Sequence, residues 1–251
     1  MDNLNRLLIF TGAGISAESG LSTFRDTNGL WKKYNIDDVC NYHNFKKDKE
    51  NHEKRAYMFN FYNDVKKAIL KAEPNEAHYQ VAKWQKQYGE DRVVIVTANI
   101  DNLFEKAGCK DVIHVHGEIF HMHCAACQSK WHIGNDEYQD IRCPHCSSSL
   151  TKPNIVFFYE DAPLYERMHY HFHPKRRQYN DLLLYVGSSM SVIHPLMLFG
   201  HSPKAKLGRT ILVNKDVSDD DILFQHQYYG NATEMLPLVD KEIVQFMMDC
   251  Y

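Results

Sequence analysis

The sequence predicts an α/β fold with a parallel sheet and a smaller inserted module. Two observations favour it: short apolar runs without strict alternation, which are typical of strands buried on both faces, and longer helix-like segments between them. The strands are expected at residues 7–10, 93–96, 182–186 and 211–214. The helices are expected at residues 49–72, 76–88 and 236–248. Strands that alternate with helices indicate the α/β class.

The inserted module is expected at residues 118–152, which are dense in Cys, His and Ser and contain no apolar run long enough for a core strand. A helix-rich stretch at residues 31–72 is a second candidate insertion. A chain of 251 residues that is 44% hydrophobic can bury a core without disulfides.

The formal net charge is −3, from 29 Lys and Arg against 32 Asp and Glu, so the chain has no overall basic field. We therefore expect no direct nucleic-acid binding and no membrane attachment. The first residues lack the pattern of a signal peptide, and the longest apolar stretch, residues 182–200, is interrupted by Ser, His and Pro. These features predict a cytoplasmic protein and leave the oligomeric state open.

Four of the seven cysteines form two Cys-x-x-Cys pairs at the spacing of a four-thiolate zinc site. The predicted ligands are Cys124, Cys127, Cys143 and Cys146. Four thiolates leave no open position for water, so the zinc is expected to be structural. A disulfide framework fits less well, because the number of cysteines is odd. Zinc ribbons also occur in nucleic-acid-binding proteins, but the net charge gives that interpretation little weight.

A zinc nucleobase deaminase is an alternative interpretation of this region. His116-Gly117-Glu118 followed by Cys143 and Cys146 resembles the H-x-E and C-x-x-C signature of those enzymes. Here, however, Pro144 follows the first cysteine instead of preceding it, and the other cysteine pair completes a metal shell without histidine. The remaining histidines have the alternate spacing of a strand, and we expect surface or packing roles for them. They are His114, His121, His123, His169, His171 and His173.

A turn of small residues follows the first expected strand, Thr11-Gly12-Ala13-Gly14-Ile15-Ser16. Such a turn lets backbone N–H groups approach a pyrophosphate closely. The dinucleotide fingerprint G-x-G-x-x-G is not met, because position 17 is Ala and the next glycine is Gly20. The turn therefore indicates phosphate binding but not a plain Rossmann dehydrogenase.

Extended to Arg25, this segment resembles the signature loop of the sirtuins, the NAD-dependent protein deacylases. Further motifs follow in the family's order and span nearly the whole chain. They are Thr97-Ala-Asn-Ile-Asp101, His114-Val-His-Gly117, the four cysteines, Pro153-Asn-Ile-Val-Phe-Phe-Tyr-Glu160, Gly187-Ser-Ser189 and Leu212-Val-Asn214. The segments at 17–20, 28–31 and 61–63 are most similar to the bacterial and mitochondrial desuccinylase branch.

The resemblance implies a single catalytic unit, residues 1–251. Its Rossmann-like large domain is expected at about 1–30, 73–117 and 153–251, and its small domain at 31–72 and 118–152. NAD, the co-substrate, is expected between them. The expected NAD contacts are Gly12, Ala13, Gly14, Ser16, Phe24, Arg25, Asn99, Asp101, Gly187, Ser188, Ser189 and Asn214. The resemblance gives Phe24 the task of keeping water from the reactive ribose carbon, and it places Asn99 and Asp101 in the nicotinamide pocket.

His116 matches the family's catalytic histidine, and the ordinary pKa of histidine suits a general base for a ribose hydroxyl. The resemblance implies that the acyl oxygen of a modified lysine attacks ribose C1′ as nicotinamide departs. His116 then activates a ribose hydroxyl, and water releases lysine and O-acyl-ADP-ribose. The expected partner is therefore an acyl-lysine protein or peptide.

Four residues match the family's substrate contacts: Tyr62, Val65, Val156 and Phe158. Val65 stands where the desuccinylase branch has Arg, which removes a charge-assisted partner for a carboxylate. We expect a preference for neutral acyl groups over succinyl, unless Lys66 or Lys67 compensates. Ala98 and Tyr159 also depart from the family's Gln and Gly, and they bear on cofactor affinity and on the width of the peptide groove.

Protein-lysine deacylation is the leading function. An NAD hydrolase or ADP-ribosyltransferase would use the same NAD site with another acceptor, and the departures at Ala98 and Tyr159 motivate that alternative. A non-catalytic NAD-binding or zinc-dependent interaction module fits less well, because five expected site residues occur together: Phe24, Arg25, Asn99, Asp101 and His116.

Overall fold

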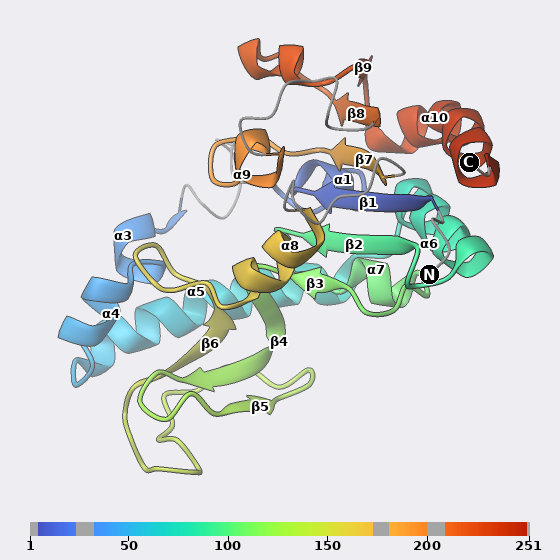
Figure 1. The fold of residues 1–251 in the computed structure, drawn as a ribbon. Coiled ribbons are helices and arrows are strands. Elements are labelled where there is room, and N and C mark those ends of the chain that lie inside the picture. Colours follow the sequence, from blue (N-terminus) through green and yellow to red (C-terminus); the bar gives the residue numbers. More distant parts are fainter. Residues whose placement is uncertain (1–4, 24–32, 173–180, 200–208, 250–251) are drawn as a thin grey trace.

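Six parallel strands form the larger sheet of the protein, in the order β3-β2-β1-β7-β8-β9 (Figure 1). The computed structural model describes residues 5–23, 33–172, 181–199 and 209–249. The strands are β1 (Arg6–Thr11), β2 (Val93–Thr97), β3 (Ile113–His114), β7 (Asp181–Val186), β8 (Arg209–Asn214) and β9 (His226–Tyr229). All four strands expected from apolar runs are present, and the two that were not expected lie at the sheet edges.

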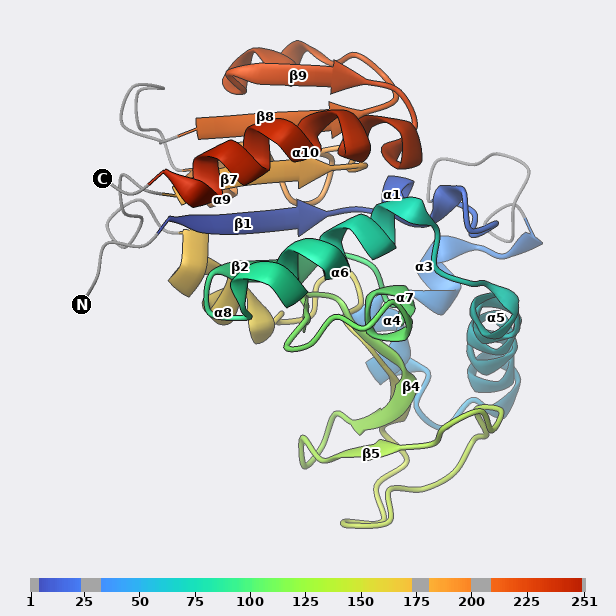
Figure 2. The ribbon, with the colours of Figure 1, turned by 90° about the vertical axis from the view of Figure 1, so that its right-hand side faces the viewer.

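Helices cover both faces of this sheet, which is why its central strands are apolar at nearly every position. One face is covered by α1 (Gly14–Ala17), α6 (Glu76–Tyr88), α7 (Leu103–Lys106) and α10 (Ala232–Met248). The other is covered by α8 (Leu164–Phe172), α9 (Pro195–Phe199) and the 3-10 helix η2 (Asp219–Leu223) with the residue after it. Figure 2 shows α6 and α10 lying side by side across the first face. This arrangement confirms the predicted α/β class.

A second, antiparallel sheet lies beside the first, in the order β5-β4-β6 (Figure 1). Its strands are β4 (Gly117–Cys124), β5 (Lys130–His132) and β6 (Thr151–Ile155). It shares one core with α3 (Ile36–Val39), α4 (Tyr42–Lys47) and α5 (His52–Lys71). The helical and cysteine-rich insertions, distant in sequence, therefore pack together as one small unit.

Polar contacts tie α5 to the cysteine-rich segment as well. Arg55 is buried, and its guanidinium donates to the Asp140 carboxylate at 2.6 Å and to the Thr151 carbonyl at 3.2 Å. Lys66 is also buried and donates to the Asp136 carbonyl at 2.6 Å. Because a buried cation needs such partners, these contacts fix how the helix meets the module.

The chain changes direction across the sheet at β1, which lies between β2 and β7. Helix α6, which precedes β2, packs on one face, and helix α8, which precedes β7, packs on the other. In open α/β sheets, ligands bind beyond the carboxyl ends of the strands at such a switch point. Across the described ranges, no helix is long and apolar enough to cross a membrane.

Candidate active site and metal centre

The loops that follow β1 and β7 pack backbone against backbone at the switch point. The Gly12 N–H donates to the Val186 carbonyl at 2.9 Å, and the Gly14 N–H donates to the Gly187 carbonyl at 2.7 Å. Gly187 has φ +59°, and a Cβ on it would lie 2.6 Å from the Ile15 nitrogen. No side chain fits there, so the glycines expected at a phosphate site also have a packing reason to be glycine.

A buried hydrogen-bond cluster connects the loops after β1 and β2. The Ser16 hydroxyl donates to the Asp101 carboxylate at 3.0 Å and accepts from the Asn99 amide at 3.1 Å. The same amide donates to the Gly12 carbonyl at 3.1 Å. Burial raises the pKa of Asp101, although the Leu103 N–H and the Ser16 hydroxyl oppose that shift. Three predicted cofactor residues, Ser16, Asn99 and Asp101, are thus joined by hydrogen bonds.

His78 joins this cluster, and sequence reasoning missed it. Its Nε2 lies 3.4 Å from the Ser16 hydroxyl, and its Nδ1 accepts from the Asn75 N–H at 3.3 Å. Asn75 and His78 form a capping box at the start of α6, and Asn75 also donates to the Ile15 carbonyl at 2.9 Å. Burial lowers the pKa of His78 to about 4. The spacing Asn-x-x-His at the start of an expected helix could have indicated His78 as a capping residue.

His116 lies in the short turn between β3 and β4, which leads into the small unit. Its Nδ1 lies 3.1 Å from the Ala98 carbonyl, and its Nε2 lies 3.0 Å from the Tyr165 hydroxyl. Burial lowers the pKa of His116, while the bond to Ala98 raises it. The Val156 N–H donates to the His116 carbonyl at 2.9 Å, which joins the expected substrate segment to the expected base.

The histidines treated as a strand-like set do not share one setting. His121 and His123 lie in β4, but His169 and His171 lie on helix α8, so the strand interpretation was wrong for that pair. His173 lies outside the described residues. His114 is buried and stabilises the loop after β2. Its Nδ1 lies 2.8 Å from the Asn99 carbonyl, and its Nε2 lies 2.9 Å from the Glu105 carboxylate.

The residues after β7 and β8 meet at the same edge of the sheet. The Asn214 amide donates to the Ser188 carbonyl at 3.1 Å. The Tyr185 hydroxyl donates to the Ile193 carbonyl at 2.7 Å and lies 3.0 Å from the Ser188 hydroxyl. Ser189 is exposed, and Ala13 caps α1 and is half-buried. Phe24 and Arg25 lie outside the residues that the structure describes.

The expected substrate residues fall into two settings. Phe158 is 39% exposed, and its backbone pairs with the chain before α4: its N–H donates to the Cys40 carbonyl at 2.8 Å and its carbonyl accepts from the Tyr42 N–H at 3.0 Å. Tyr62 is buried and stacks on Phe157, with ring centroids 5.8 Å apart. Val65 is half-buried against the same core, and Val156 is half-buried beside His116.

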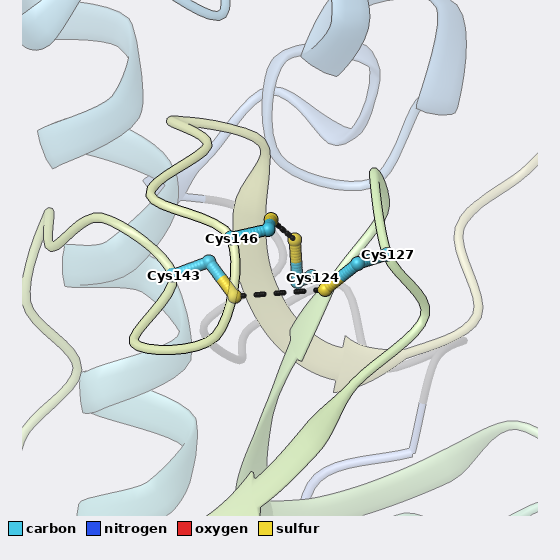
Figure 3. Close-up of side chains that lie close together, drawn as sticks. All are labelled: Cys124, Cys127, Cys143 and Cys146. Carbon is cyan, nitrogen blue, oxygen red and sulfur yellow. Dashed lines mark hydrogen bonds between the residues drawn. The ribbon is translucent and has the colours of Figure 1, made fainter.

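The four predicted metal ligands converge. Cys124 and Cys127 lie at the end of β4, Cys143 and Cys146 lie in the loop before β6, and all four sulfur atoms lie within 4.8 Å of one another (Figure 3). Cys124 Sγ lies 3.6 Å from Cys146 Sγ, and Cys127 Sγ lies 3.7 Å from Cys143 Sγ. A tetrahedral zinc with Zn–S bonds of about 2.3 Å requires sulfur separations of about 3.8 Å. The residues therefore fit a structural zinc ion.

A phosphate-type glycine turn at the switch point of a parallel sheet, with a buried histidine and carboxylate beside it, defines an α/β nucleotide-binding protein with an added zinc module. The chain belongs to the Sir2 family, whose model matches residues 12–194. The predicted sirtuin resemblance is confirmed.

Named relatives agree with this assignment. The NAD-dependent protein deacylase of Helicobacter hepaticus is 34% identical over 261 residues, covering 97% of this chain and 99% of that protein. A crystal structure of a Sir2 homologue with NAD superposes with a TM-score of 0.77 at 26% identity, covering 98% of this chain and 91% of the other. A Sir2 variant with a deacetylated p53 peptide and 3′-O-acetyl ADP ribose gives 0.72 at 27% identity, covering 96% and 94%.

Proposed function

We propose that this protein is an NAD-dependent protein-lysine deacylase that forms nicotinamide, O-acyl-ADP-ribose and free lysine. The observation that carries the proposal is the position of His116, a half-buried imidazole joined to the loop of Asn99 on one side and to Val156 on the other. The Sir2 membership and the deacylase relatives of similar length support it.

NAD supplies a ribose carbon that becomes electrophilic when nicotinamide leaves. We assign its phosphates and riboses to Gly12, Ala13, Gly14, Ser16, Gly187, Ser188, Ser189 and Asn214, with Phe24 and Arg25 as further contacts. The adjoining loops after β1, β7 and β8 support this assignment. Asn99 and Asp101 are assigned to nicotinamide. Ser16 and the Leu103 N–H hold the Asp101 carboxylate in one orientation, which suits it to accept from an amide.

His116 is assigned as the general base. The Ala98 carbonyl can only accept a hydrogen bond, so the proton of the neutral ring is on Nδ1 and the lone pair is on Nε2. Burial lowers the pKa of His116, which keeps this lone pair available near neutral pH.

We propose that neutral acyl groups are preferred over succinyl. Neither lysine that follows Val65 is free to replace the missing arginine: Lys66 donates to the Asp136 carbonyl at 2.6 Å, and Lys67 pairs with Glu137 at 2.8 Å. With valine at position 65, a carboxylate in the acyl pocket loses the charge-assisted partner that arginine would provide there. A higher kcat/KM for succinyl-lysine than for acetyl-lysine peptides would contradict this proposal, and Val65→Arg is expected to shift the ratio toward succinyl.

The cysteine cluster is assigned to a structural zinc, and we propose a cytoplasmic location. The four converging sulfur atoms support the zinc assignment. They also support the location, because cysteines stay unoxidised and able to bind metal in a reducing compartment.

The deciding experiment incubates the protein with NAD and acetyl-, succinyl- or long-chain acyl-lysine peptides, with a no-peptide control and His116→Ala. Nicotinamide and peptide mass are measured. We expect nicotinamide release that requires a peptide, removes its acyl group and is lost in the variant. Release without peptide would instead establish NAD hydrolysis or ADP-ribosyl transfer, and binding of NAD without release would indicate a non-catalytic module.

A further inference from the structure

Tyr165 contacts His116 although no motif connects the two residues. Its hydroxyl lies 3.0 Å from Nε2 of His116, and the two ring centroids are 6.1 Å apart. Tyr165 lies near the start of α8, is half-buried and packs against the core of the large sheet. Packing of the fold therefore fixes this contact between Tyr165 and His116.

Helix α8 is fixed at this position from two sides. Met168 and Phe172 are fully buried in the core between the helix and the sheet. On the outer side, the Arg167 guanidinium donates to both oxygens of Asp111 at 2.6 and 2.7 Å, next to the start of β3. These contacts hold the helix that carries Tyr165 against the strand that precedes His116.

The chemistry of the imidazole fixes the direction of the hydrogen bond. The proton of the neutral ring is on Nδ1, because that nitrogen faces the Ala98 carbonyl. Nε2 therefore accepts, and the Tyr165 hydroxyl donates to it. Burial lowers the pKa of His116, in keeping with a neutral ring.

The Nε2 atom has a single lone pair, so it accepts from one donor at a time. We propose that Tyr165 is a positioning residue that occupies the basic nitrogen of His116 until a ribose hydroxyl replaces it. The inference rests on the proposed function, in which His116 takes a proton from that hydroxyl. Until the exchange, Tyr165 satisfies the part-buried Nε2 atom, while the Ala98 carbonyl keeps the ring in the tautomer that the reaction needs.

The role predicts that Tyr165→Phe speeds the step in which His116 acts as base, since no internal donor competes for Nε2. A hydrogen bond between neutral groups of ordinary net strength corresponds to a change of about two- to tenfold. Nicotinamide formation precedes that step and is expected to keep its rate. Tyr170→Phe is the matched control, because Tyr170 lies on the same helix and is exposed.

Rapid-quench measurements with saturating NAD and an acetyl-lysine peptide separate the two steps. We expect faster O-acyl-ADP-ribose formation in Tyr165→Phe, unchanged nicotinamide formation, and wild-type rates for both steps in Tyr170→Phe. Equal or slower O-acyl-ADP-ribose formation in Tyr165→Phe would overturn the proposal.

Nitrogen-15 NMR of histidine-labelled protein tests the contact without turnover. The His116 Nε2 resonance is expected to move in Tyr165→Phe and to stay in place in Tyr170→Phe, and an unmoved resonance in Tyr165→Phe would overturn the proposal. A wild-type protein without deacylase activity would refute the proposed function, and with it the role of Tyr165. The NMR result would still decide whether the hydrogen bond exists.

Discussion

At the scale of single residues, His116 illustrates how burial sets reactivity. Its half-buried imidazole has one carbonyl and one hydroxyl partner, and among the described residues no carboxylate contributes to its pKa, so desolvation is the main cause of the shift. The sequence could indicate the residue through the family motif, but not its partner Tyr165, because that contact depends on how α8 packs against β3.

The lowered pKa of His116 predicts activity that persists into mildly acidic solution. The ring is neutral above its pKa and loses its basicity as the pH falls through it, so the acid limb of kcat/KM is expected below 6.5, the ordinary value for histidine. The pH profile of peptide-dependent nicotinamide release checks this, with His116→Ala as the blank. An acid limb above 6.5 would show that a charged partner, and not burial, controls the group.

A second prediction at this scale concerns the effect of a side chain at Gly187 on stability. A methyl group at Gly187 would lie 2.6 Å from the backbone of Ile15, so Gly187→Ala is expected to lower the free energy of unfolding by about 2–4 kcal/mol and to weaken NAD binding. Gly108→Ala is the control, since Gly108 also has positive φ, +100°, but nothing lies within 4 Å of the added atom. Denaturant unfolding compares the two. Equal losses would mean that backbone strain, and not the clash, governs both positions.

At the scale of elements, periodicity and apolar runs predicted the buried centre of the large sheet. The edge strands were missed because they are short or polar: β3 has two residues, and β9 reads His-Gln-Tyr-Tyr with most positions exposed. Strand β4 was missed because a bulge between Gly117 and Met122 interrupts its alternation. The exact limits of the two domains stay a prediction.

The N-terminus of α6 gives a prediction for stability. Burial lowers the pKa of His78 to about 4, whereas the unfolded chain has an ordinary histidine near 6.5. The unfolded state therefore binds the proton more tightly, so His78 contributes stability above pH 6.5 and loses it as the pH falls toward 4. By linkage, the loss amounts to about 3 kcal/mol.

His78→Gln removes this titration while it keeps a side chain that accepts a hydrogen bond at the capping position. We expect the variant to show a shallower fall in the free energy of unfolding between pH 6.5 and 4, measured by denaturant titration. His169→Gln on α8 is the control and should keep the wild-type slope. A wild-type slope in His78→Gln would show that other groups carry the acid sensitivity.

At the scale of the whole molecule, the cysteine cluster and α5 both hold the small unit together. The cluster joins the end of β4 to the loop before β6, and Arg55 and Lys66 join α5 to the segment between them. Cysteine spacing was enough to predict the metal site, whereas these buried cations were not predicted, because nothing in the local sequence distinguishes them from solvated charges.

Zinc removal is therefore expected to loosen the small unit before the large sheet. With a chelator, hydrogen exchange should rise in β4, β5 and β6, while β1, β2 and β7 stay protected, because binding of a structural zinc contributes directly to folding. Metal analysis should find one zinc per chain, lost in Cys143→Ala and retained in Cys109→Ala, a buried thiol outside the cluster. Uniform loss of protection would show that the two units unfold together.

The position of β1 in the sheet also affects the order in which the chain can fold during synthesis. β1 is made first, yet it pairs with β2 and with β7, whose last residue is Val186. Pairings so distant in sequence are slow to form. On the ribosome, the glycine turn after β1 therefore lacks its counterpart until Gly187 has emerged. A nascent chain would expose one edge of this apolar strand throughout that interval, so the backbone groups of that edge would stay open to pairing with other chains.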